Sequence, residues 1–170
     1  MLNGFLAGAI GGLAGTWVMS EAQRAWTCAV EGRAPDSAAD EHDARDWQER
    51  HEGQNSNELA SQTLAMTVIG RRLTRDELSV AARVLHYGFG AVVGGIYGMW
   101  VERRHRVRRR TGLALGTTLW LTADEIAMPL LGLSQPTTRR PFEMHLQSLV
   151  AHLVYGMTAE MTRCSIRRAV

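Results

Sequence analysis

The sequence contains no lysine, so all 19 basic residues among its 170 are arginines. It has two cysteines, Cys28 and Cys164, which lie near opposite ends of the chain and form neither a CxxC pair nor a zinc-binding spacing. We therefore expect no disulfide framework and no metal site. The net charge of +2 is also too small to indicate a nucleic-acid partner.

The chain also lacks the short motifs of the common enzyme classes. It contains no nucleophile elbow, no HExxH zinc motif, no phosphate-binding loop, no dinucleotide-binding fingerprint and no covalent haem motif. We therefore predict that the protein is not an enzyme and carries no cofactor. The first apolar segment has no basic region before it, and glycine and tryptophan continue where a cleavage site would stand, so we expect no cleaved signal peptide.

What the sequence does contain is four apolar segments, each roughly the 20 residues that cross a bilayer as a helix. They occupy residues 2–19, 79–100, 113–133 and 144–161. Ionisable residues occur within them, which indicates that the helices bury faces against one another. We predict an all-α, four-span transmembrane helix bundle, a single membrane domain over residues 1–170, with spans at about 2–24, 77–102, 112–133 and 144–163. A soluble helical bundle is the alternative.

Arginine clusters predict the orientation of this bundle. Six arginines lie between residues 103 and 110, and three more follow the last apolar segment at Arg163, Arg167 and Arg168. Because basic residues in short loops stay on the cytoplasmic side, both segments are expected to face the cytoplasm. We therefore predict a bacterial inner-membrane protein with both termini in the cytoplasm and residues 27–76 in the periplasm. Its first partner is the lipid bilayer.

The predicted periplasmic segment begins with a polar stretch that is rich in aspartate and glutamate. His42 and His51 lie within this stretch beside the acids, a combination that binds divalent cations in some proteins. Their spacing matches no specific metal motif, however. We therefore predict a solvated helix or loop here and no metal site.

A short amphipathic helix is predicted to follow. Residues 57–70 place Leu59, Leu64 and Val68 along one helical side, and Gly70 is a plausible end. We expect this helix to lie on the outer membrane surface or on the mouth of the bundle. The next residues, from Thr74 to Glu77, then fit a capping box that starts the second span.

Glycine repeats at intervals of four residues in the first two apolar segments. The repeats are Gly4, Gly8 and Gly12 in the first segment, and Gly90, Gly94 and Gly98 in the second. In lipid, where no hydrophobic force drives helices together, small residues let two backbones approach closely. We therefore expect these glycines to form helix-packing faces in a tight bundle or an oligomer.

Ionisable residues of three segments are predicted to share one depth in the membrane. Counted from the outer ends of their spans, His86, Asp124 and His152 all lie roughly 12–14 Å deep at 1.5 Å per residue, and Arg83 lies one turn above His86. An ionised acid that faces lipid costs several kcal/mol, so we expect Asp124 to face the bundle interior. Its predicted hydrogen-bond partner is one of His86, His152 and Arg83.

Two neighbours of Asp124 belong to the same predicted layer. Pro129 has no N–H, so it removes the hydrogen bond that the Glu125 carbonyl would accept, which kinks the helix and frees an acceptor at this depth. The Glu125 side chain lies about 100° around an α-helix from Asp124. We expect Glu125 to face a subunit interface or to be held protonated by burial.

The sequence from Gly112 onward resembles a known family. It is similar to the YagU-like family of bacterial inner-membrane proteins, a domain of unknown function. The shared features are Gly112, Pro129, Leu130, Gly132, Leu133, Pro136, Pro141, His152 and Glu160. The glycine-rich first segment and His86 fit more loosely. The resemblance implies a multi-span inner-membrane protein with a link to acid tolerance, and it implies no established chemistry.

Four interpretations of the polar layer stay open from the sequence. The layer fixes helix register, it carries protons or cations, a transmembrane histidine (His86 or His152) ligates haem or a chlorophyll-type pigment, or the layer takes part in catalysis, for which the chain has no motif. The function that we predict first is a non-enzymatic packing or accessory subunit of a larger membrane assembly or of a homo-oligomer. The alternatives are a proton- or cation-handling protein that supports acid tolerance and, after it, a pigment-binding protein.

Overall fold

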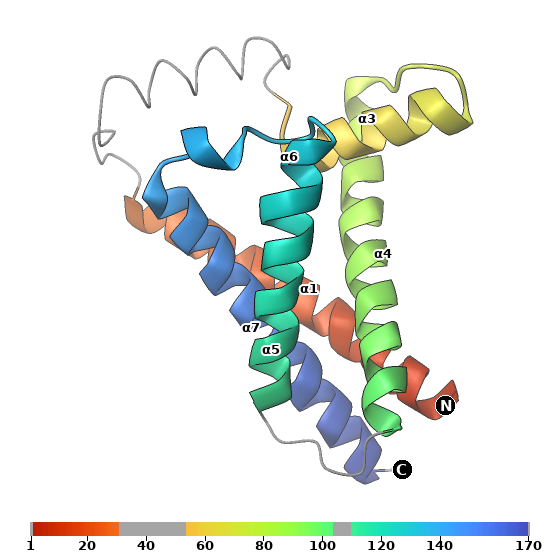
Figure 1. Ribbon diagram of the computed structural model, residues 1–170. Helices are drawn as coiled ribbons and strands as arrows, with labels where there is room; N and C mark the ends of the chain where they lie inside the picture. The colour runs from red at the N-terminus through yellow and green to blue at the C-terminus, as the bar shows by residue number, and fades with distance from the viewer. Residues whose placement is uncertain (1, 31–53, 104–109, 170) are drawn as a thin grey trace.

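The computed structural model describes residues 2–30, 54–103 and 110–169 of the chain (Figure 1). Every regular element in these ranges is a helix, which confirms the all-α prediction for this part. The long helices are α1 (Leu2–Val30), α4 (Arg75–Glu102) and α7 (Phe142–Ala169). The shorter ones are α3 (Ser56–Val68), α5 (Arg110–Leu119), the π-helix η1 (Trp120–Ala127), α6 (Met128–Leu130) and the 3₁₀-helix η2 (Thr137–Arg139).

Two features of the sequence lie outside the described residues. They are the acidic stretch with His42 and His51, and the arginine-rich segment over residues 104–109. The orientation in the membrane, which depends on those arginines, therefore stays a prediction.

Helix α1 packs against both α4 and α7 and forms the centre of the bundle (Figure 1). α5, η1 and α6 follow one another as a single column that packs on α7, and α3 lies across the start of α4. Helices that pack on each other along their length run in opposite directions. The two marked chain ends in Figure 1 therefore lie at the same end of the bundle, where α4 also finishes.

Glycines bring the backbones of α1 and α4 into direct contact. The six glycines of the two repeats meet across this interface as Gly4 with Gly98, Gly8 with Gly94, and Gly12 with Gly90. A Cβ atom added to Gly8, for example, would overlap the carbonyl oxygen of Gly94. The two repeats thus face each other within one chain, in antiparallel order.

Small residues also close the interfaces of α7, while large apolar side chains remain outside. The close contacts are Gly11 with Ala159 and Gly15 with Tyr155 between α1 and α7, and Gly112 with Gly156 and Gly116 with His152 between α5 and α7. Trp17 on α1 is 56% exposed and Ile96 on α4 is 53% exposed. An interior of small residues beneath an apolar exterior is typical of helices that pack in lipid.

Two helices in the described part of the chain are long and apolar enough to cross a membrane. They are Leu2–Ala29 within α1 and Arg75–Glu102, which is α4. The third predicted span is divided among α5, η1 and α6, and α7 carries charged residues among its apolar ones. By length and composition, two helices of the described chain could therefore cross a membrane, and the number of four spans stays a prediction.

Local sequence signals set the helix ends around the connection from α3 to α4. Asn55 and Glu58 form a capping box at the start of α3. Gly70 follows the end of α3 with a φ of 72°, a conformation that glycine adopts easily. The predicted capping box at α4 is confirmed, because Thr74 and Glu77 each accept the other's backbone N–H.

Helix α3 turns its small residues toward α4. Ser61 and Ala65 are buried, and α4 is the element on which α3 packs. Leu64 and Val68 are exposed. The side of this helix that carries Leu64 and Val68 therefore points away from α4, while the helix itself lies across the start of α4 at the end of the bundle.

Candidate functional site

The third apolar segment changes its helical geometry at its two acids. η1 is a π-helix, in which backbone hydrogen bonds reach five residues back instead of four. The N–H of Met128, for example, donates to the carbonyl of Ala123. The wider turn rotates each residue less than an α-helix does, so that Asp124 and Glu125 both meet the segment that follows α6. Short π-helices of this kind are frequent at functional sites.

The hydrogen bonding of the Glu125 carbonyl group depends on Pro129 and on the loop after α6. Pro129 lies four residues after Glu125 and has no N–H to donate to this carbonyl. The hydroxyl of Thr137 donates to it instead, at 2.9 Å. The acceptor that the proline frees is therefore satisfied by the loop.

The side chain of Glu125 forms a buried pair with His145 of α7. His145 Nδ1 lies 2.8 Å from Glu125 Oε1, and His145 Nε2 lies 3.0 Å from the carbonyl oxygen of Thr137. Because a carbonyl oxygen only accepts, Nε2 must carry a hydrogen. The contact at Nδ1 then requires one more proton, held by the imidazole or by the carboxyl group. The Glu125 side chain is only 7% exposed, and the two distances fit a pair that shares one proton.

Asp124 has different partners from Glu125. The hydroxyl of Ser148 on α7 donates to its carboxylate, and Arg140 Nη1 lies 3.9 Å from it. The Arg140 side chain is 7% exposed. The loop after α6 surrounds it, and its other nitrogens donate to the Gln135 carbonyl and to the Ser134 hydroxyl. A buried cation therefore balances the charge of Asp124.

His152 extends the network one turn further along α7. Its Nδ1 atom donates to the carbonyl oxygen of Ser148 at 2.8 Å and lies 3.4 Å from the Ser148 hydroxyl. That hydroxyl gives its hydrogen to Asp124, so His152 does not act on it as a base. The residue types of a hydrolytic triad are present, but the order of their hydrogen bonds produces no activated nucleophile.

The structure assembles only part of the predicted layer. Ser148 stands between Asp124 and His152, so the predicted direct hydrogen bond from Asp124 is wrong. His86 and Arg83 line a different cavity, which α1, α3 and α4 surround. His86 is nevertheless within electrostatic range of His152. The polar layer is therefore a network of α7 and η1, with His86 beside it.

The prediction that Glu125 faces a subunit interface is also wrong. Its carboxyl group points into the chain's own interior, at His145. The angle of 100° between neighbouring residues applies to an α-helix, whereas this segment is a π-helix.

Sequence reasoning missed Arg140, His145 and Ser148. A signal for two of them exists, because His145, Ser148 and His152 recur at intervals of three and four residues and so share one side of a helix. Depth in the membrane relates residues on different helices, whereas this spacing relates residues on one helix. Arg140 precedes the fourth apolar segment, and nothing in its spacing relates it to Asp124.

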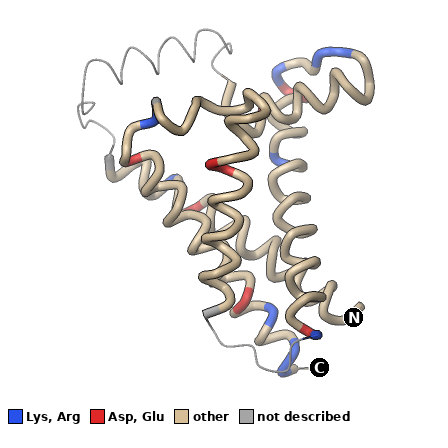
Figure 2. The backbone as a smooth tube through the Cα atoms, in the orientation of Figure 1, with Lys and Arg blue, Asp and Glu red and all other residues tan. Residues whose placement is uncertain are grey.

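A second buried polar cluster lies toward the end of the bundle that holds both termini, where Figure 2 shows acidic and basic residues near one another. Arg163 donates two hydrogen bonds of 2.8 Å to Glu160, and their side chains are 8% and 5% exposed. The Tyr97 hydroxyl donates to Glu160 at 3.1 Å and meets the Thr111 hydroxyl at 2.8 Å. The Cys164 thiol donates to Glu160 as well, at 3.2 Å. Glu160 thus joins α4, α5 and α7.

Close helix packing separates the two clusters. Between His152 and Glu160, α7 meets α5 backbone to backbone, and a Cβ atom added to Gly156 would overlap Gly112 and Gly116. Backbone contact between α5 and α7 thus separates the cluster at η1 from the cluster at Glu160 along this interface.

Comparison with known proteins adds a family but no activity. A family model described as "Protein of unknown function (DUF1440)" matches residues 54–161. The match runs from just before α3 into α7, and it includes η1, its partners and Glu160. No curated protein and no solved structure matches the chain.

Proposed function

The chain belongs to the DUF1440 family of proteins of unknown function, and from its geometry we propose that it is an inner-membrane protein that binds and releases a proton near its outer surface. The observation that carries this proposal is the pair of Glu125 and His145, whose contact requires a proton. The resemblance to the YagU-like family, with its link to acid tolerance, agrees with such a role.

The membrane location is supported by the arrangement of the helices. α1 and α4 are apolar enough to cross a bilayer, and the column from α5 to α6 and α7 run beside them in alternating directions (Figure 1). Four crossings place both chain ends on one side, which the arginine-rich sequences assign to the cytoplasm. The cluster at η1 then lies toward the periplasmic end, where it meets the pH outside the cell.

Loss of the proton changes the contact between η1 and α7. Without it, the Glu125 carboxylate faces the lone pair of His145 Nδ1, and two acceptors repel each other. The other charged groups at this position, Asp124 and Arg140, have opposite charges and lie 3.9 Å apart. In this proposal the pair of Glu125 and His145 is the element that gains and loses the proton, and acid favours the closed contact.

Hydrogen–deuterium exchange measured by mass spectrometry tests this role. In the wild-type protein in detergent, we expect the protection of peptides that cover residues 134–148, corrected for the intrinsic exchange rate, to fall as the pH rises. Where the open form predominates, release of one proton lowers this protection about tenfold for each unit of pH. The variant Glu125→Gln should remain closed at every pH, because its amide donates to a neutral His145 Nδ1 without a proton.

A matched control for this experiment is Asp76→Asn. Asp76 is an exposed acid in the first turn of α4, at the same end of the bundle, and its substitution likewise replaces a carboxyl group with an amide. We expect this variant to keep the pH dependence of the wild type. Equal pH dependence in wild type and Glu125→Gln, or none in the wild type, would show that the pair does not bind the proton.

A packing or accessory role is a second candidate, and the exposed apolar faces favour it. Trp17, Phe89, Ile96 and Trp100 are large apolar side chains with about half of their surface exposed. The glycine repeats are already occupied by each other, so association with another membrane subunit or a second copy would use these faces. Purification in a mild detergent should then yield an oligomer or a co-purifying subunit, and a strictly monomeric particle without partners would contradict this role.

A further inference from the structure

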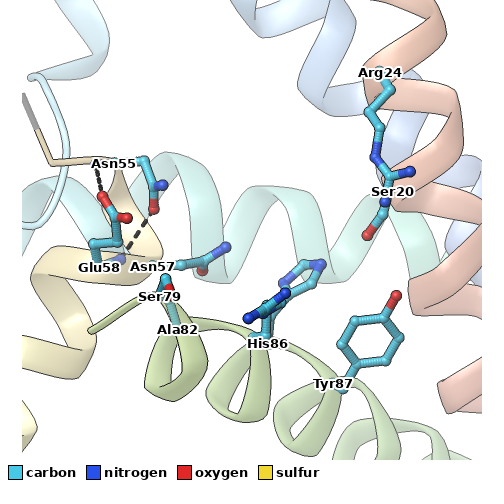
Figure 3. Close-up of a pocket in the computed structure, with 10 residues that line it drawn as sticks. Ser20, Arg24, Asn55, Asn57, Glu58, Ser79, Ala82, His86 and Tyr87 are labelled. Carbon is cyan, nitrogen blue, oxygen red and sulfur yellow. Dashed lines mark hydrogen bonds between the residues drawn. The ribbon is translucent and has the colours of Figure 1, made fainter. Parts of the chain in front are cut away.

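A cavity of about 380 Å³ lies between α1, α3 and α4, and His86 in its lining is within electrostatic range of His152 in the η1 cluster. Ser20 and Arg24 line it from α1, Asn57 lines it from α3, and Arg83 and His86 line it from α4. Figure 3 shows Ser20 and Arg24 of α1, Asn57 of α3 and His86 of α4 around one space. The volume is within the range of roughly 300–1,000 Å³ that small-molecule sites occupy.

The lining of this cavity has more positive than negative charge available for a ligand. Arg83 forms no hydrogen bond or ion pair with another residue that the structure describes. Arg24 donates to Glu21 through Nη1 at 2.9 and 3.1 Å, and its other nitrogens form no hydrogen bond with another residue that the structure describes. The acid in the lining, Glu58, is engaged by the backbone N–H of Asn55 in the capping box. Two guanidinium groups with free donors suit an anion with several oxygens, above all a phosphate group.

We propose that this cavity binds the phosphate of an anionic phospholipid head group. Arg83 and Arg24 bind the phosphate oxygens. Ser20, Asn57 and the Tyr87 hydroxyl, which are neutral donors and acceptors, then meet the hydroxyl groups of a glycerol head group.

The surroundings of the cavity favour a lipid as the source of the phosphate. Val80 and Val84 follow the lining residues Ser79 and Arg83 directly on α4, and both valines are exposed. A polar cavity that opens beside an apolar helix surface fits a molecule with a charged head and acyl chains. Recognition of a lipid depends on the proposed membrane location, whereas recognition of phosphate does not.

Native mass spectrometry of the full chain in detergent tests the proposal, with phosphatidylglycerol and phosphatidylcholine as the two probes. We expect the wild type to bind phosphatidylglycerol about tenfold more tightly than phosphatidylcholine, a difference of about 1.4 kcal/mol. Arg83→Gln and Arg24→Gln should each remove most of this preference. The control Arg75→Gln removes an exposed cation from the first turn of α4 that does not line the cavity, and it should bind as the wild type does.

Competition with inorganic phosphate separates the two sources of the anion. If millimolar phosphate binds at Arg83 and Arg24 while the two lipids bind alike, the lipid head group is ruled out and a soluble phosphate compound is the ligand. If Arg83→Gln and Arg75→Gln have equal effects, the cavity is not the site. Because these arginines lie outside the η1 cluster, the variants should keep the pH-dependent hydrogen exchange. The lipid site and the proton site can therefore be contradicted separately.

Discussion

Gly94→Ala is expected to destabilise the bundle by about 3 kcal/mol, although it adds a single methyl group. A Cβ atom at this position would overlap the carbonyl oxygen of Gly8 and lie 2.7 Å from the Cα atom of Gly12. Both neighbours are backbone atoms, so no side-chain rotation relieves the overlap. Helices α1 and α4 must therefore move apart, which loosens the packing along their interface. Denaturant unfolding in detergent, followed by circular dichroism, measures the loss.

Gly88→Ala is the matched control for this substitution. Gly88 lies six residues earlier on the same helix, and a Cβ atom built there has no neighbour within 4 Å. Alanine favours a helix over glycine by about 1 kcal/mol. We therefore expect Gly88→Ala to be as stable as the wild type or more stable. If Gly94→Ala and Gly88→Ala had the same stability, the contact between α1 and α4 would be wrong.

The glycine repeats and the capping box could be predicted because each depends on residues close together in the sequence. A spacing of four places Gly90, Gly94 and Gly98 on one side of a helix whatever lies opposite. In the same way, Thr74 and Glu77 satisfy each other's backbone groups within one turn. The spacing does not identify the helix that packs on these glycines. A helix of a second copy and another helix of the same chain require the same spacing.

The partners of the two acids depend on features that spacing does not contain. The π-helix changes the directions of Asp124 and Glu125, and it forms where Pro129 leaves the α-helical pattern of hydrogen bonds incomplete. Arg140 reaches Asp124 because the loop after α6 folds back over the helix end. The second cluster could not be predicted from spacing either, because Tyr97 and Glu160 are 63 residues apart in the sequence.

The second cluster should make Arg163→Met one of the most damaging single substitutions in the chain. It leaves the buried Glu160 without its cation, and removal of one partner from a buried ion pair costs about 3–5 kcal/mol. Arg167→Met is a control on the same helix, one turn later. Arg167 binds Glu102 at 2.9 Å, but its side chain is 36% exposed, so its loss should cost about 1 kcal/mol or less.

A double variant separates the lost ion pair from simple loss of packing. In Glu160→Gln/Arg163→Met no charge remains in the cluster, and the glutamine still accepts the hydrogen bond of Tyr97. Because neutral groups of similar size replace a buried ion pair at little cost, the double variant should recover most of the stability that Arg163→Met loses. The same unfolding measurement applies to all three variants. If the double variant were less stable than Arg163→Met, the damage would come from lost packing, and Glu160 would not depend on Arg163 for its charge.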